Sequence, residues 1–264
     1  MITIKDLIKT FHRGSINEVL ALAGINLQVA KGDFITVIGS NGAGKSTLLN
    51  CLAGSYAIDS GQIRIDEQEV TRWPEHQRAT LISRVFQDPL LGTCAALSIE
   101  QNLALANRRG RRHGLGKGVK RSDRELFRQQ LAQLGLGLEE RLKDPVGLLS
   151  GGQRQALTLL MATLVKPKIL LLDEHTAALD PKTAQQVLEL TQQLISEQQL
   201  TALMVTHNMR QALQLGNRLI MLHGGRVILD VSGEEKAAMT VENLLEQFYA
   251  VRGEEFVSDR MLLV

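Results

Sequence analysis

The residues Gly39-Ser40-Asn41-Gly42-Ala43-Gly44-Lys45-Ser46-Thr47 have the types and spacing of a phosphate-binding loop. They fit the pattern G-x-x-x-x-G-K-[ST], in which glycines allow successive backbone N–H groups to turn towards phosphate oxygens. A helix predicted over 45–53 would offer its positive N-terminal end to the same oxygens. Lys45 has the reach to contact β- and γ-phosphates, and the Ser46 hydroxyl is placed to ligate Mg²⁺. The stretch therefore predicts a nucleotide site.

Two adjacent carboxylates follow an apolar run later in the chain. Residues 169–172 are predicted to form a buried strand, and Asp173 and Glu174 come at its end. A carboxylate in that place is explained if it contacts the metal ion, directly or through water. Glu174 then points elsewhere, as a base that orients or deprotonates the attacking water must. The alternative, a solvated strand end, is disfavoured by the phosphate-binding loop upstream.

A second stretch with glycines, Ser150-Gly151-Gly152-Gln153, opens a helix predicted over 153–164. Ser150 is placed to cap this helix by accepting a hydrogen bond from a free backbone N–H group. A helix start that contains glycines also favours an anion, so the stretch is compatible with a phosphate contact as well.

Four segments in order, 39–47, 149–155, 169–174 and 206–207, together resemble the ATPase subunit of an ABC transporter. The resemblance covers about residues 1–230. It implies an α/β fold, with a P-loop NTPase (RecA-like) core, an N-terminal antiparallel β subdomain and an α-helical subdomain inserted at about 89–165. Residues 231–264 are expected to form a short C-terminal tail. The implied activity is hydrolysis of ATP with Mg²⁺, coupled to transmembrane transport.

The resemblance also implies roles that spacing alone leaves open. Gln87 matches the family's glutamine loop, which senses Mg²⁺ and the water, although a plain turn explains Gln-Asp-Pro equally well. His207 matches the switch histidine that contacts the γ-phosphate, and a structural histidine is the alternative. Phe11 stands where the family often stacks a tyrosine on adenine, and stacking requires only the ring face. His175 replaces the usual proline beside the base. A titratable side chain there could perturb the base, but a loop position without effect on it is favoured.

Partners follow from the same resemblance. In the family, Ser150 and Gly152 bind the γ-phosphate held by a second subunit, and Gly151 and Gln153 belong to the same ATP-binding stretch. This implies two shared sites in a homodimer that ATP closes and hydrolysis reopens. Residues 177–180 match the loop that crosses that interface. An integral membrane permease and, indirectly, a solute-binding protein are implied, with the chain at the cytoplasmic face of a bacterial membrane. Import of a small organic solute such as an amino acid is favoured.

The competing class is a soluble ABC ATPase that acts on nucleic acid or ribosomes. Chromosome-type members carry a long coiled-coil insertion and translation-type members carry two ATPase domains, and neither feature is visible in 264 residues. A formal net charge of +2 argues against a nucleic-acid binder, because a strongly basic domain is expected there. With 44% hydrophobic residues, the composition is that of an ordinary soluble globular protein.

Other sequence features bear on location and packing. We expect no signal peptide at the N-terminus and no membrane span, since no apolar stretch approaches eighteen residues. The two cysteines make neither a disulfide framework nor a metal site, and Cys51 is expected to pack in the core.

Local patterns predict the elements that must position these residues. Alternating apolar residues predict strands over 2–8, 19–29 and 62–65, and a short apolar strand over 33–38 leads into the phosphate-binding loop. Capping boxes at Ser98 and Ser122 predict two helix starts in the insertion. From residue 169, strands and helices alternate, which predicts parallel strands joined by helical crossovers.

The insertion contains two further features. Eight basic residues lie between 107 and 125, and they are Arg108, Arg109, Arg111, Arg112, Lys117, Lys120, Arg121 and Arg124. They predict either a solvated flexible loop or a surface for anionic lipid or a permease, whereas RNA has no aromatic support nearby. Residues 90–107 contain a surplus of leucine and isoleucine. Some of these side chains are expected to pack on the insertion's own helices, and the rest could line a groove for a short permease helix.

Overall fold

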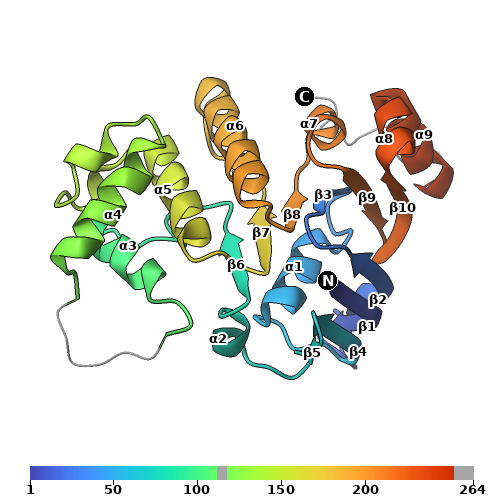
Figure 1. Cartoon of the computed structure of the whole chain (residues 1–264). Helices are drawn as coiled ribbons and strands as arrows, with labels where there is room; N and C mark the ends of the chain where they lie inside the picture. The colour runs from blue at the N-terminus through green and yellow to red at the C-terminus, as the bar shows by residue number, and fades with distance from the viewer. Residues whose placement is uncertain (112–117, 253–264) are drawn as a thin grey trace. The chain divides into compact units, whose positions relative to one another are not determined.

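The computed structural model describes residues 1–111 and 118–252 (Figure 1). The chain divides into two compact units, one formed by residues 1–78 with the chain from 201 onwards, the other by residues 79–200. The predicted bounds of a helical subdomain, 89–165, are a finer division than these units and stay a prediction.

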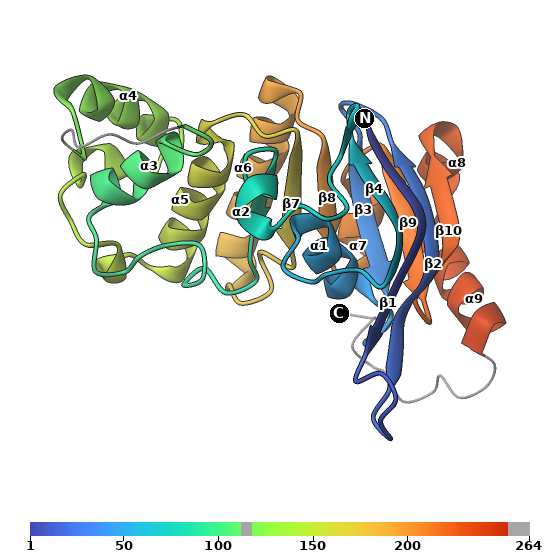
Figure 2. The same cartoon turned by 90° about the horizontal axis from the view of Figure 1, so that it is seen from below.

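An antiparallel sheet forms one part of the first unit. Its strands are β1 (Ile2–Phe11), β2 (Val19–Val29), β4 (Ser60–Ile65) and β5 (Gln68–Glu69), in the order β2-β1-β4-β5 (Figures 1 and 2). Ile2 pairs with Val29 on one side and with Ile65 on the other, and all three side chains are buried. The predicted N-terminal antiparallel β subdomain is confirmed.

Parallel strands form the other part of the first unit. Strand β3 (Phe34–Gly39) lies between β8 (Ala202–Val205) and β9 (Arg218–His223) and is parallel to both, while β10 (Arg226–Ser232) is antiparallel to β9. Helices α1 (Lys45–Ala53), α2 (Glu75–Arg78) and α7 (Met209–Gln214) belong to the same unit. Every residue of β3 is buried, as expected for a central parallel strand.

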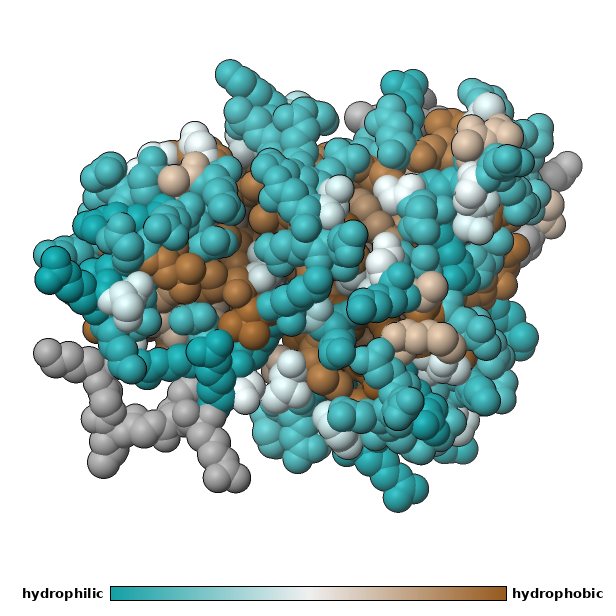
Figure 3. Space-filling model, in the orientation of Figure 1, coloured by the Kyte–Doolittle hydropathy of each residue, from teal (hydrophilic) through white to brown (hydrophobic). Residues whose placement is uncertain are grey.

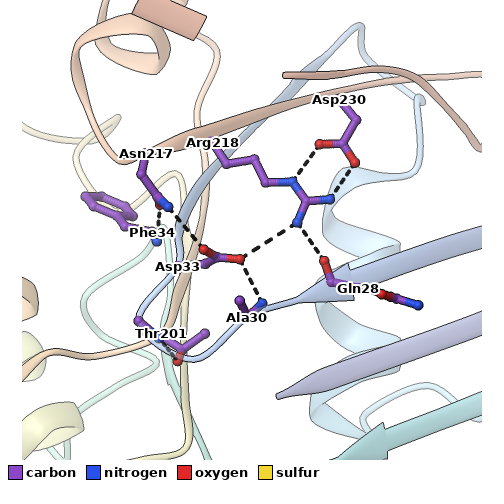
Figure 4. Close-up of polar contacts among 9 residues, drawn as sticks. Gln28, Ala30, Asp33, Phe34, Thr201, Asn217, Arg218 and Asp230 are labelled. Carbon is purple, nitrogen blue, oxygen red and sulfur yellow. Dashed lines mark hydrogen bonds and ion pairs between the residues drawn. The ribbon is translucent and has the colours of Figure 1, made fainter. Parts of the chain in front are cut away.

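A polar network ties β2, β9 and β10 together (Figure 4). The Arg218 guanidinium donates to both oxygens of Asp230, at 2.6 and 2.5 Å, and to the Gln28 carbonyl at 2.6 Å. Asp33 lies 3.8 Å from the same guanidinium and accepts from the Ala30 N–H at 2.8 Å. Charge-assisted bonds of this kind fix the strands at one end of the unit.

Two helices follow β10 in the first unit. They are α8 (Gly233–Ala238) and α9 (Val241–Arg252). Leu244 and Phe248 of α9 are fully buried, in one core cluster with Ile38 of β3 and Met221 of β9. The segment up to residue 252 thus contributes to the core that supports β3.

The second unit combines a parallel strand pair with helices. Strand β6 (Ile82–Val85) pairs with β7 (Ile169–Asp173), and the helices are α3 (Ile99–Asn107), α4 (Arg121–Ala132), α5 (Gly151–Leu164) and α6 (Pro181–Gln198). Two short 3-10 turns, η1 (Leu138–Glu140) and η2 (Val146–Leu148), precede α5. Leu103, Phe127 and Leu157 are fully buried in a cluster shared by α3, α4 and α5.

One of the two capping boxes predicted in this unit is confirmed and the other is wrong. Ser98 accepts from the Gln101 N–H at 3.3 Å, and the Gln101 side chain accepts from the Ser98 N–H at 2.8 Å. Helix α4, however, begins at Arg121, because the Asp123 carboxylate accepts from the Lys120 N–H at 2.8 Å. Glu125 has the same three-residue spacing from Ser122, but Ser122 already lies inside the helix and therefore cannot cap its start.

The basic segment 107–125 is not wholly solvated. Arg109 donates to two carbonyls at the C-terminal end of α5, and Arg124 makes a two-bond ion pair with the buried Glu100 at 2.6 and 3.1 Å. Residues 112–117 lie outside the described residues. The expectation of a flexible, solvent-exposed loop is therefore wrong for Arg109 and Arg124, because both have partners that the sequence places far away.

Candidate functional site

The phosphate-binding loop joins β3 to α1, and its glycines are required by close packing. A Cβ on Gly39 would lie 2.3 Å from the Leu222 carbonyl oxygen, and one on Gly44 would lie 2.5 Å from the Ala21 carbonyl oxygen. Gly44 also has φ +99°, and Gly42 has φ +76°, a region that L side chains rarely adopt. Only glycine permits this backbone, which is the form that turns N–H groups towards an anion.

Lys45 begins α1 and is buried inside the loop. Its ammonium donates to the carbonyls of Gly39 at 2.7 Å and Ser40 at 3.0 Å, and the residue is 6% exposed. Asn41, Gly42 and Ser46 are exposed. The positive charge is therefore held in place by the loop itself, next to a helix N-terminus that favours phosphate.

Thr206 and His207 follow β8, the strand beside β3. The Thr206 N–H donates to the Val37 carbonyl at 3.2 Å, so the ends of the two parallel strands lie together. The Thr206 hydroxyl accepts from the Asn208 N–H at 3.1 Å, while Asn208 caps α7. His207 is half-buried at the same edge of the parallel strands as the phosphate-binding loop.

Phe11 ends β1 and has a supported ring. The Tyr56 ring lies edge-on to it, with centroids 5.3 Å apart, and the Lys9 ammonium lies 5.4 Å from its centroid. Asp59 holds this strand end by accepting from the Thr10 N–H at 2.5 Å. An aromatic ring fixed in this way suits stacking against a flat base.

In the second unit, Asp173 ends β7 and forms an ion pair with Arg84 of the neighbouring strand β6. The Arg84 guanidinium donates to Oδ2 of Asp173 at 2.7 Å, and the two side chains are 13% and 12% exposed. The guanidinium also lies over the Phe86 ring, 4.6 Å from its centroid. Sequence reasoning missed Arg84, although an arginine inside a short apolar strand is itself a sign of a buried partner.

Glu174 and His175 follow Asp173 in a tight turn. Glu174 has φ +47°, and its carbonyl accepts from the Ala177 N–H at 3.0 Å. His175 is 2% exposed, and its Nε2 lies 3.0 Å from Oγ1 of Thr191 on α6. Burial lowers the pKa of His175 to about 4, since it disfavours the charged ring. The ring is therefore uncharged at neutral pH and lies in the interior of the unit.

The helix start at Ser150 is confirmed. Ser150 caps α5 by accepting from the Gln153 N–H at 3.2 Å, and the Gln153 side chain accepts from the Ser150 N–H at 3.2 Å. A Cβ on Gly152 would lie 2.1 Å from the Thr183 methyl group of α6, so any other residue would displace Thr183. Ser150 and Gly151 are exposed, which leaves the helix start open to a ligand.

Gln87 is exposed in the turn after β6. The carbonyl of the preceding residue, Phe86, accepts from Gln155 of α5 at 3.2 Å, so the turn is tied to this helix. Mg²⁺ prefers oxygen ligands. The Gln87 amide oxygen, the Ser46 hydroxyl and the Asp173 carboxylate are ligands of this kind. Within the described residues no group of three or more His, Cys, Asp or Glu is placed to hold a metal ion.

The predicted residues are therefore brought together in two sets. The first unit places the phosphate-binding loop and His207 at one strand edge, and the second places Asp173 and Glu174 at the end of β7.

No helix in the described part of the chain is both long and apolar enough to cross a membrane.

The chain is similar in sequence to ATP-binding proteins of ABC transporters. The ABC transporter family model matches residues 22–177. The tyrosine transport ATP-binding protein of Clostridioides difficile is 47% identical over 252 residues, which cover 95% of this chain and 100% of the relative. The thiamine import ATP-binding protein ThiQ of Yersinia pseudotuberculosis is 38% identical over 206 residues, 78% of this chain and 82% of ThiQ.

Solved structures agree with this result. A dimeric ATP-binding cassette in a post-hydrolysis state, bound to ADP and Pi, superposes with a TM-score of 0.75 at 28% identity. The match covers 88% of this chain and 98% of that one. The fold is thus that of the P-loop ATPase cassettes, as predicted. Its sequence and its fold together show that the chain belongs to the family of ABC transporter ATP-binding proteins and is an ATP-hydrolysing subunit of that kind.

Proposed function

We propose that residues 39–47 hold the triphosphate of MgATP and that Glu174 is the base that activates the attacking water. The observation that carries this proposal is the backbone of the loop. It requires glycine at positions 39 and 44, and it encloses the buried Lys45 ammonium. A fixed positive charge beside a helix N-terminus stabilises the negative charge that develops on the transferred phosphoryl oxygens.

The remaining roles are assigned by the chemistry of each side chain. Ser46, Gln87 and Asp173 would hold Mg²⁺ through oxygen atoms, and the ion would neutralise charge on the β- and γ-phosphates. Arg84 keeps the Asp173 carboxylate fixed through its Oδ2 atom. His207 would contact the γ-phosphate, and the adenine would stack on Phe11, whose ring Tyr56 supports.

We propose further that the working form is a homodimer. Ser150 and Gly152 would contact the γ-phosphate bound by the partner subunit, because they belong to a glycine-rich helix start that the chain does not need for its own phosphate-binding loop. Ser150 and Gly151 are exposed at this start, and Gly152 is buried behind them. Residues 177–180 would cross the same interface. The dimeric state of the relative that is bound to ADP and Pi supports this arrangement.

The solute that we propose is tyrosine or a closely related amino acid. The tyrosine transport ATP-binding protein matches this chain over its full length, including the helices after β10. ATP hydrolysis would then power uptake through a separate integral membrane permease, with the chain at the cytoplasmic face of the membrane and a solute-binding protein outside it.

A groove in the second unit offers a contact for that permease. It has a volume of about 190 Å³, is mostly apolar, and is lined by Leu97, Gln101, Ala104, Leu105, Arg108, Gly118 and Val119. Leu105 is 60% exposed, and Figure 3 shows hydrophobic residues, in brown, on the surface over α3. Nearby in the sequence, Leu90 and Leu91 are 52% and 68% exposed. An apolar permease helix would cover such side chains.

One set of variants tests the proposed function. Lys45→Ala is expected to abolish ATP binding, because the loop loses its charge, whereas Glu174→Gln should bind ATP and lose turnover by roughly a hundredfold or more. In cells that lack the native gene, neither variant should restore uptake of labelled tyrosine. Near-native hydrolysis by Glu174→Gln would show that the base is another group. If the native chain restored uptake of other solutes in these cells, but not of tyrosine, the proposed solute would be excluded.

A further inference from the structure

The buried histidine beside the proposed base is joined to a helix sixteen positions along the chain. His175 Nε2 lies 3.0 Å from the Thr191 hydroxyl in the middle of α6, and both residues are almost fully buried. None of the functional roles assigned above uses this pair. Its position, one residue after Glu174, makes it a candidate for orienting that side chain.

The hydrogen bonds around Thr191 define which ring nitrogen carries the proton. The Thr191 hydroxyl has one hydrogen, and it donates this hydrogen to the Val187 carbonyl at 2.7 Å. The hydroxyl oxygen must therefore accept from His175, so Nε2 of the neutral ring bears the hydrogen.

The turn that carries Glu174 needs an anchor. Its φ of +47° is uncommon for a residue other than glycine, and such a backbone persists only where the surroundings hold it. The turn is fixed at its far end by Asp180, which caps α6 by accepting from the Thr183 N–H at 3.1 Å. At its near end, the first side chain after Glu174 that reaches the interior is His175.

We propose that His175 is a positioning residue that fastens the Glu174 turn to α6 through Thr191 and so fixes the direction of the Glu174 carboxylate. A ring held in the interior fixes the backbone at position 175, and with it the Cα–Cβ direction of the neighbouring Glu174. The proposal rests on the role of Glu174 as the base. A misplaced base lowers the rate of the chemical step and leaves nucleotide binding unchanged.

The test compares two substitutions of Thr191. Thr191→Val keeps the shape and removes the acceptor, and it is expected to lower kcat about tenfold, with the Kd for ATP changed by less than about twofold. Thr191→Ser keeps the hydroxyl and should retain a near-native kcat. His175→Phe, which keeps an aromatic ring without the N–H group, should lose as much as Thr191→Val, and the double variant should lose no more than either.

A matched control separates positioning from loss of stability. Thr163 in α5 is also buried and also donates its hydroxyl hydrogen to a carbonyl of its own helix, that of Leu159 at 3.0 Å, so Thr163→Val removes an equivalent bond away from the turn. It should lower the melting temperature and leave kcat near native. A native kcat in both Thr191→Val and His175→Phe, or an equal loss in Thr191→Ser, would overturn the proposal.

Repeating the Thr191 substitution in the Glu174→Gln variant distinguishes this proposal from the assignment of Glu174 as the base. In Glu174→Gln, adding Thr191→Val should cause no further loss of turnover, because no base remains to be oriented. A further tenfold loss in that background would mean that His175 acts through another group. Failure of the base assignment has a different signature, which is near-native turnover in Glu174→Gln by itself.

Discussion

His175 illustrates how a single buried side chain couples stability to pH. Burial lowers its pKa from the ordinary 6.5 to about 4, so the unfolded chain binds this proton more readily than the folded chain does. The stabilisation is complete above pH 6.5 and is lost as the pH falls from 6.5 towards 4.

We predict that this residue causes part of the loss of stability in acid. Between pH 7 and pH 5, protonation of His175 in the unfolded chain is expected to lower the free energy of unfolding by roughly 2 kcal/mol. His175→Phe removes the titrating group, so its stability should fall less between pH 7 and pH 5 than that of the native chain. Urea unfolding at both pH values measures the difference. Parallel losses in the two proteins would refute the prediction.

At the level of elements, helix α1 carries Lys45 at its start, and Arg78 supports its end. The Arg78 guanidinium donates to the Cys51 and Leu52 carbonyls of α1, at 2.5 and 2.9 Å, and also to the Thr71 and Trp73 carbonyls. Cations are favoured at a helix C-terminus, where the last carbonyls lack partners within the helix. This arginine therefore fastens the helix that begins at the phosphate-binding loop.

We predict that Arg78→Met destabilises the chain by roughly 2–4 kcal/mol, because buried carbonyls lose their donors while the side-chain volume is nearly kept. Denaturant unfolding followed by circular dichroism measures the change. Arg72→Met, an exposed arginine six positions earlier, is the matched control and should change stability by less than about 0.5 kcal/mol. Equal effects of the two substitutions would contradict the role given to Arg78.

At the scale of the whole molecule, the proposed homodimer depends on nucleotide. If Ser150 and Gly152 complete the site of a partner, then ATP without Mg²⁺ should convert monomers into dimers, and ADP should not, since it lacks the γ-phosphate that joins the subunits. Glu174→Gln traps the bound state. Light scattering at saturating ATP measures the mass, and a monomer under these conditions would count against the shared site.

The permease contact is a second property of the whole molecule. Leu91→Glu, at a side chain that is 68% exposed, should leave the ATPase activity of the isolated chain near native and reduce co-purification with the permease and solute uptake. Ile16→Glu, at a fully exposed position of the other unit, serves as the control. Native co-purification and uptake with Leu91→Glu would rule out Leu91 as part of the contact.

The sequence by itself determined the local parts of this protein. The phosphate-binding loop, the strand before it and the helix from Lys45 to Ala53 follow from glycine spacing and from runs of apolar residues, which act over a few positions. The caps at Ser98 and Ser150 are likewise three-residue patterns. The family followed from four such stretches in order, because each carries its own chemistry.

Only the tertiary structure decided which distant residues meet. Arg84 and Asp173 are 89 positions apart, and their ion pair exists because β6 and β7 pair in parallel. His175 meets Thr191 because α6 packs over the turn, and Phe248 completes the core beside β3 although it follows the last predicted strand by many residues. Local sequence preferences do not predict such contacts, because packing and burial in the folded chain determine them.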